Sequence, residues 1–114
     1  MKSNWRVLSQ CLLLALVGAF VLAVPLRAQE ADGAALFKQK CSMCHGADGK
    51  GFAAIKTPDF TDPKWQAAIT DDQIVETIKN GKKGTPMPPF KDKLKEEEIQ
   101  ALVKHIRSLN SEKK

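Results

Sequence analysis

The residues with the clearest chemical potential are two cysteines and a histidine in Cys41-Ser42-Met43-Cys44-His45. On one helical turn, residues three apart lie on the same face, roughly 5–6 Å apart between Cβ atoms. That spacing suits two thioether bonds to the two vinyl groups along one haem edge, and His45 then points its ring toward the iron. The pattern is typical of covalent attachment of a c-type haem. We therefore expect one haem c, bound through Cys41 and Cys44, with His45 as an iron ligand.

A Cys-x-x-Cys pair also occurs as half of a zinc site and as a thiol redox pair. A structural zinc site takes about four protein ligands. Outside the motif the chain offers only Cys11, in an apolar N-terminal run, and His105, near the C-terminus. A redox pair of the thioredoxin kind accompanies a βαβ pattern, and none is visible around Cys41. The surrounding sequence therefore favours haem attachment.

The N-terminal segment, residues 1–28, predicts a secretory signal peptide. Lys2 and Arg6 supply positive charge at its start, and an apolar run follows over residues 11–24. The run is shorter than the ~20 apolar residues that a membrane-spanning helix needs. We expect the segment to be removed on export to the periplasm, which leaves a mature domain over residues 29–114. The alternative is an uncleaved leader that anchors the protein to the membrane.

Length and charge limit what the exported part can do. The whole chain has 18 basic and 13 acidic residues, a formal net charge of +5. Three basic residues, Lys2, Arg6 and Arg27, belong to the leader, which leaves 15 against 13 and a net charge of +2. This balance, with 6% aromatic residues, argues against a nucleic-acid partner. A domain of this length buries only about 60–65% of its unfolded surface, so we expect it to fold poorly without its haem.

Capping residues and apolar periodicity predict an all-α fold with about four short helices around one haem. Asp32, Asp62 and Thr70 can cap three of the expected helices, the last helix is predicted from apolar residues at helical spacing, and no segment predicts a strand. The expected helices are residues 30–40, a short helix from Asp62 with Pro63 at its first position, a helix from Thr70 to Asn80-Gly81, and residues 95–109.

The iron needs a second axial ligand unless one position stays open, and the chain offers three candidates. Met43 lies between the attachment cysteines and points the wrong way. Met87 lies in a loop that Pro86 and Pro88 stiffen, because proline fixes φ and lowers the entropy lost on folding. His105 flanks the apolar stripe of the last helix, where a packing role is the alternative. We favour Met87 as the ligand, since His/Met ligation is the expected pair in cytochromes c; its own alternative is core packing.

In the order of its motifs the chain resembles the small class I cytochromes c, over nearly all of residues 30–110. The haem motif alone is specific for haem c, and the ordered set is specific for this class. The matching features are Gly33-x-x-x-Phe37, Cys41-x-x-Cys44-His45, Asn80-Gly81, Met87-Pro88-x-Phe90 and a C-terminal helix.

The resemblance implies a cytochrome c-like fold in which the N- and C-terminal helices cross near the haem. It implies that His45 and Met87 are the axial ligands and that the carbonyl of Pro58 accepts the Nδ1–H hydrogen bond of His45, which would fix the ring tautomer. Trp65 completes the expected cofactor-binding set. Where many relatives place Tyr or Trp on the last helix, this chain has His105, which we interpret as a substitute aromatic ring.

These residues predict a single-electron carrier and no enzyme, because an iron with protein ligands on both sides has no site for substrate. The expected partners are an unidentified electron donor and acceptor, the expected state is a monomer, and contact with the membrane is expected only through partners or an uncleaved leader. The alternative is a cytochrome subunit of a membrane-associated redox enzyme complex. Catalysis or gas sensing at an open iron position, and a zinc module, are the remaining hypotheses.

Overall fold

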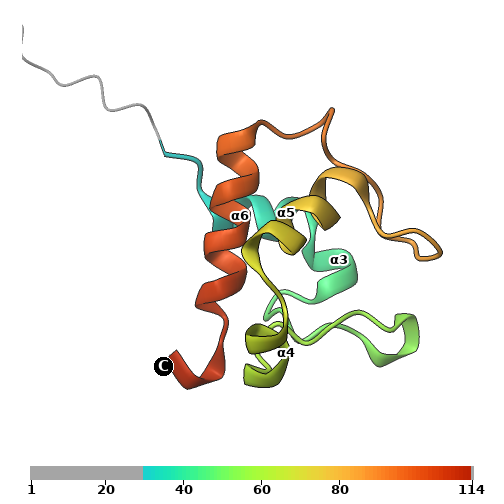
Figure 1. The fold of residues 1–114 in the computed structure, drawn as a ribbon, viewed down its shortest axis with the longest axis vertical. Helices are drawn as coiled ribbons and strands as arrows, with labels where there is room; N and C mark the ends of the chain where they lie inside the picture. Colours follow the sequence, from blue (N-terminus) through green and yellow to red (C-terminus); the bar gives the residue numbers. More distant parts are fainter. Residues whose placement is uncertain (1–29, 114) are drawn as a thin grey trace, which may run out of the picture.

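The computed structural model describes residues 30–113, and the predicted signal peptide lies outside this part of the chain. The described residues form five α-helices and two 3-10 turns, with no strand among them, which confirms the expected all-α class (Figure 1). None of these helices is long and apolar enough to cross a membrane. In chain order the elements are α2 (Gly33–Lys40), α3 (Ser42–His45), η2 (Ala53–Ile55), α4 (Pro63–Ala68), α5 (Asp71–Asn80), α6 (Glu96–Ser108) and η3 (Ser111–Lys113).

Side-chain caps determine where the helices begin. Asp32 accepts hydrogen bonds from two backbone N–H groups of the first turn, at 3.0 and 3.1 Å, so α2 begins at Gly33 and not at residue 30. Thr70 and Gln73 form the predicted capping box at the start of α5, with reciprocal hydrogen bonds of 2.9 and 3.2 Å. Such caps satisfy N–H groups that have no partner inside the helix.

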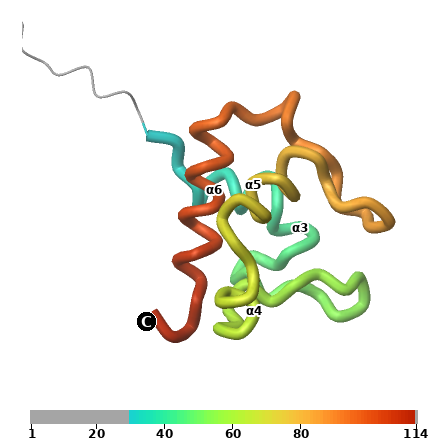
Figure 2. Tube along the Cα trace, in the orientation of Figure 1, coloured from blue at the N-terminus to red at the C-terminus, as the bar shows by residue number. Residues whose placement is uncertain are grey.

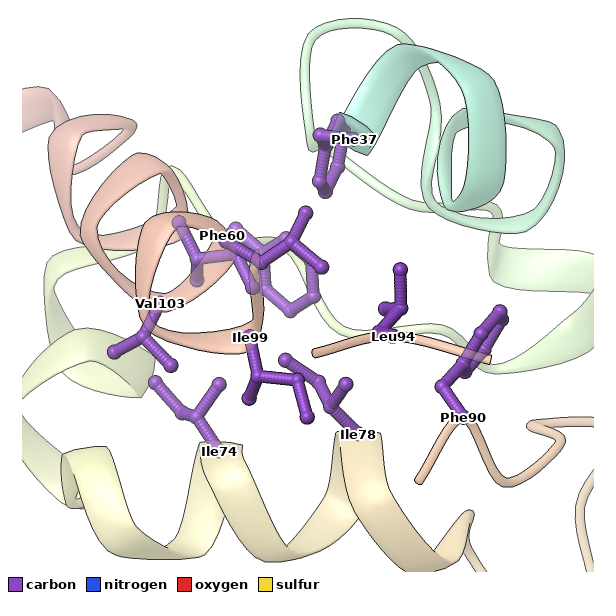
Figure 3. Packing of buried hydrophobic residues seen from close by; sticks show 10 residues of the cluster. Phe37, Phe60, Ile74, Ile78, Phe90, Leu94, Ile99 and Val103 are labelled. Carbon is purple, nitrogen blue, oxygen red and sulfur yellow. The ribbon is translucent and has the colours of Figure 1, made fainter. Parts of the chain in front are cut away.

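The hydrophobic core lies where α2 and α5 pack against α6. Figure 3 shows Ile74 and Ile78 pointing from α5 toward Ile99 and Val103, while Phe37 approaches from α2. Burial of these apolar side chains is the main favourable contribution to folding. The buried hydrophobic residues of the cluster are Phe37, Phe60, Ile74, Ile78, Phe90, Leu94, Ile99, Leu102, Val103 and Ile106.

Helix α2 crosses α6 at close range because its first residue is a glycine. A Cβ at Gly33 would overlap the carbonyl oxygen of Ala101. Beside this crossing, the ring centroid of His105 lies 5.0 Å from that of Phe37, so the imidazole packs as an aromatic ring would. Burial lowers the pKa of His105, and the carboxylate of Asp32 partly opposes that shift. The imidazole is therefore neutral near pH 7.

Two loops, residues 46–62 and 81–95, extend beyond the helices on the side where α3 lies (Figure 2). Both are tied to the rest of the fold by backbone hydrogen bonds. The N–H of Phe60 donates to the carbonyl of Gly49 at 2.8 Å, and the N–H of Phe90 donates to the last turn of α5 at 2.9 Å. The loops are thus ordered connections that bring their side chains to the surroundings of α3.

Candidate haem-binding site

Helix α3 is a single turn that carries the predicted attachment motif. The N–H groups of Cys44 and His45 both donate to the carbonyl oxygen of Cys41, at 3.2 and 2.9 Å. Cys41 is half-buried against the hydrophobic core, Cys44 is exposed, and both thiols are free. The structure therefore places the two cysteines one helical turn apart, with His45 on the same turn.

The surroundings of Cys41 favour a neutral thiol. Burial raises the pKa of the Cys41 thiol to about 11, and the neighbouring Cys44 adds to the shift. Metal binding and thiol exchange both use the thiolate. Across residues 30–113, no group of three or more His, Cys, Asp or Glu side chains is placed to hold a metal ion. Burial thus makes the Cys41 thiol a poor nucleophile, and among the described residues no zinc-ligand cluster is assembled around it.

His45 is half-buried and lies among aromatic rings. Its imidazole stacks on Phe60, with ring centroids 4.8 Å apart and an interplanar angle of 20°, and Phe37 lies 6.5 Å away. Burial lowers the pKa of His45, which keeps the ring neutral, as a metal ligand must be. Its Nδ1 atom is buried and has no hydrogen-bond partner among the described residues. An unsatisfied buried polar atom costs about 1–3 kcal/mol and calls for a functional explanation.

The predicted acceptor for that atom, the carbonyl of Pro58, belongs to the returning arm of the first loop. The N–H of Phe52 donates to Thr57 Oγ1 at 2.6 Å, which closes the loop just before Pro58. A Cβ at Gly51 would lie only 2.6 Å from the Pro58 carbonyl oxygen. No hydrogen bond joins Pro58 to His45 in the described structure, so the role of Pro58 stays a prediction.

Met87 is half-buried and packs against the edge of the hydrophobic core. Its carbonyl accepts a hydrogen bond from the N–H of Lys82 at 3.3 Å, and its own N–H donates to Thr85 Oγ1 at 3.3 Å. A Cβ at Gly81 would lie 2.6 Å from the Met87 carbonyl oxygen. The loop is therefore folded back on itself around Met87. Packing and iron ligation are both compatible with this position, so ligation remains a prediction.

Trp65 lies on α4, at one end of a row of aromatic rings that starts at His45. Its ring centroid is 4.8 Å from that of Phe60, which itself stacks on His45. Trp65 also borders a groove of about 690 Å³ between α4 and α5, which Ala68, Ile69, Asp72, Gln73, Glu76 and Thr77 line as well. The sequence prediction omitted Phe60. An aromatic residue directly after the extended Pro58-Asp59 segment was the available signal.

The residues in place fit a covalently bound haem. The site offers two free thiols one turn apart, a neutral imidazole with an unpaired nitrogen, and a thioether in a folded loop. Large apolar side chains are also exposed on this side: Phe52 and Ile55 are 47% and 43% exposed, and Met43 is 89% exposed.

Comparisons with known proteins give a consistent result. The family described as "Cytochrome C oxidase, cbb3-type, subunit III" matches residues 28–106. The chain is 34% identical over 83 residues to the Cbb3-type cytochrome c oxidase subunit FixP of Bradyrhizobium sp. (strain ORS 278), covering 73% of this chain. It is 30% identical over 82 residues to the subunit CcoP of Cereibacter sphaeroides (strain ATCC 17023), covering 72% of this chain. The chain spans 28% of the length of each of these two relatives.

A solved structure agrees with the sequence relatives. The KustC0563 c-type cytochrome superposes with a TM-score of 0.65 and 39% identity, covering 69% of this chain and 98% of that one. These findings confirm the all-α cytochrome c fold and the resemblance to small c-type cytochromes. Because the sequence relatives are named as oxidase subunits, they fit the alternative expectation, a cytochrome subunit of a redox enzyme complex, better than a free carrier.

Proposed function

The chain belongs to the family of subunit III of cbb3-type cytochrome c oxidase, and on this premise we propose that it passes single electrons as the cytochrome component of a membrane-associated redox complex. When bound, one haem c supplies a one-electron change at its iron. Cys41 and Cys44 would hold that haem covalently, and His45 and Met87 would bind its iron. With two protein ligands on the iron, no position would be left for a substrate, so we assign this domain no catalytic residue.

The observation that carries the proposal is the unpaired Nδ1 of His45, on the same helical turn as two free cysteines. A neutral imidazole that binds iron through one nitrogen offers an N–H at the other, and a nearby carbonyl usually accepts it. The carbonyl of Pro58 is our assigned acceptor. Formation of that hydrogen bond would fix the ring orientation and raise the basicity of the ligand. Trp65 lies two rings away from His45, with Phe60 between them.

Assembly into an oxidase-like complex rests on the relatives, of which this chain covers about a quarter. The expected partners are therefore other redox subunits, and the expected location is the periplasmic face of the membrane. The second candidate is a free periplasmic carrier. The KustC0563 c-type cytochrome favours it, because that protein is covered over 98% of its length.

The decisive test is the native protein purified from its source and measured in both oxidation states. We expect the absorption bands of a haem, a mass that exceeds the polypeptide by one haem, and a colour that stays with the chain after denaturation. A colourless protein, or a haem released by acid and organic solvent, would disprove the proposal. Carbon monoxide binding to the reduced protein at neutral pH would show an open iron position and exclude Met87 as a stable ligand.

Membrane association separates the two candidates. We expect the haem-stained band in the membrane fraction, co-purifying in mild detergent with an oxidase activity. Recovery of the whole haem signal in the periplasmic fraction, with the leader absent from the intact mass, would favour the free carrier.

A further inference from the structure

Gln66 is the one polar side chain found buried in the core of residues 30–113, at 7% exposure. Its Nε2 donates to the carbonyl oxygens of Phe60 and Ile106, at 2.6 and 2.9 Å. Its Oε1 accepts from Nη1 of Arg107 at 3.0 Å. Two carbonyls on one side and a guanidinium on the other allow only one orientation of the amide, since the reverse would set oxygen against oxygen. Both N–H groups and the oxygen therefore have partners, as a buried amide requires.

Arg107 links the side-chain amide of Gln66 to backbone carbonyls at the C-terminal end of α4. Its Nη1 also donates to the carbonyl of Gln66 at 2.7 Å, and its Nη2 donates to the carbonyl of Ile69 at 2.7 Å. Its Nε forms an ion pair with Asp71 at 2.6 Å. A cation is favourable at the C-terminal end of a helix, where carbonyl groups lack partners. One side chain of α6 thus holds the end of α4 and the beginning of α5 together.

The network ends at Phe60, the residue that covers the imidazole of His45. The carbonyl of Phe60 accepts from Gln66, and its N–H donates to the carbonyl of Gly49 at 2.8 Å. Both backbone polar groups are therefore fixed. The ring that these bonds orient stacks on His45 at 4.8 Å and touches Trp65 at the same centroid distance.

We infer that Gln66 and Arg107 are positioning residues for the iron ligand His45 and act on it through Phe60. The inference rests on the proposed function, in which His45 binds the haem iron. Partners beyond the ligand itself orient it and tune the metal. A stacked ring restricts rotation of the imidazole about its bond to iron, and a fixed backbone holds that ring in place. The network therefore sets the orientation of the ligand as well as the stability of the fold.

The test compares two variants of the network with two controls, all prepared as the haem-containing protein. Gln66→Met removes the two donors without a change of charge, and Arg107→Lys keeps the charge but loses the planar set of donors. Gln100→Met makes the same chemical change at an exposed position of α6. Val103→Ala lowers stability from the buried face of α6, and the side chain that it shortens makes no hydrogen bond.

The readout is the set of paramagnetically shifted His45 ring resonances in the oxidised protein, together with the reduction potential. We expect these resonances to move in Gln66→Met and in Arg107→Lys, beyond the scatter set by the two controls, and the potential to change with them. If the Gln66→Met protein cannot be obtained with haem, the His45 resonances of Arg107→Lys alone decide the test. Unmoved His45 resonances in a network variant that is as unstable as Val103→Ala would overturn the inference and leave the proposed function intact. A native protein without haem would overturn both.

Discussion

The two sides of this molecule differ in whether the protein itself buries its apolar side chains and supplies hydrogen-bond partners for its buried polar atoms. On the helical side, made of α2, α4, α5 and α6, the apolar core residues are buried, and the buried amide of Gln66 in α4 has partners for all its polar atoms. On the loop side, made of α3 with residues 46–58 and 81–88, Phe52 and Ile55 are exposed and Nδ1 of His45 is buried without a partner. The chain itself completes the helical side, and in our proposal a haem held by the motif completes the loop side.

The largest expected effect comes from removing both attachment points. In a Cys41→Ala, Cys44→Ala double variant we expect no covalent haem and a strong loss of stability, because so small a domain depends on a core-forming cofactor. Amide hydrogen exchange followed by mass spectrometry should show the loop side losing protection first and α6 last. Met43→Ala, at the exposed position between the cysteines, is the control and should keep the haem. Native-like protection of the loop side in the variant without haem would contradict the claim that the loop side depends on the haem.

A core substitution on the helical side should have the next largest effect. Leu102 is 1% exposed, and truncating a buried leucine to alanine costs about 2–5 kcal/mol through lost contacts and a cavity. Met43→Ala, at 89% exposure, should stay within about 0.5 kcal/mol of the native protein. Urea unfolding monitored by circular dichroism measures the free energy of unfolding of both variants. If Leu102→Ala and Met43→Ala lose equal amounts of unfolding free energy, packing on the helical side does not dominate the stability of the protein.

Two glycines show where the loop side is itself constrained. Gly84 has a φ of +78°, and a Cβ there would meet nothing within 4 Å, so Gly84→Ala should cost only the left-handed backbone penalty, about 1–2 kcal/mol. Gly51 has a φ of +70°, and a Cβ there would lie 2.6 Å from the Pro58 carbonyl and 2.7 Å from that of Thr57. Gly51→Ala should therefore lower the thermal midpoint more than Gly84→Ala does, since each 1 kcal/mol corresponds to about 4–8 °C. Equal thermal midpoints for the two variants would show that the loop of residues 46–62 accommodates a Cβ at Gly51 without extra loss of stability.

The smallest expected effect is a pH dependence at the crossing of α2 and α6. Because burial lowers the pKa of His105 below its unfolded value of 6.5, the unfolded chain binds the proton more readily. His105 should therefore cost no stability above pH 6.5, and stability should fall as the pH drops from 6.5 through the lowered pKa. His105→Phe should remove that part of the slope in thermal midpoints between pH 7 and 5. An unchanged slope in the variant would assign the pH dependence to other groups.

Local sequence patterns predicted the parts of the fold that depend on neighbouring residues. The spacing of Cys41 and Cys44 gave one helical turn, and Thr70 with Gln73 gave a capping box, because both are decided within four residues. The predicted segment of residues 30–40 begins three residues before α2, although Asp32 was recognised as a possible cap; the side chain of Asp32 caps the helix and so sets its first residue at Gly33.

The site was predicted less completely, for a physical reason. The contacts of Gln66 with Ile106 and Arg107 join residues about 40 positions apart, and no local pattern encodes such a pairing. Phe60 could be seen as an apolar residue but not as the ring that covers His45. The assignments of Met87, Pro58 and Trp65 depend on the haem itself and stay predictions.

The central claim is that the iron lies between His45 and Met87, and one spectroscopic measurement tests it most directly. The oxidised native protein should show the weak absorption band of a sulfur-to-ferric-iron charge transfer. Met87→Ala should abolish that band and lower the reduction potential, because a thioether ligand raises it, while Met43→Ala should leave both unchanged. If Met87→Ala keeps the band and the potential of the native protein, the account of this site is wrong.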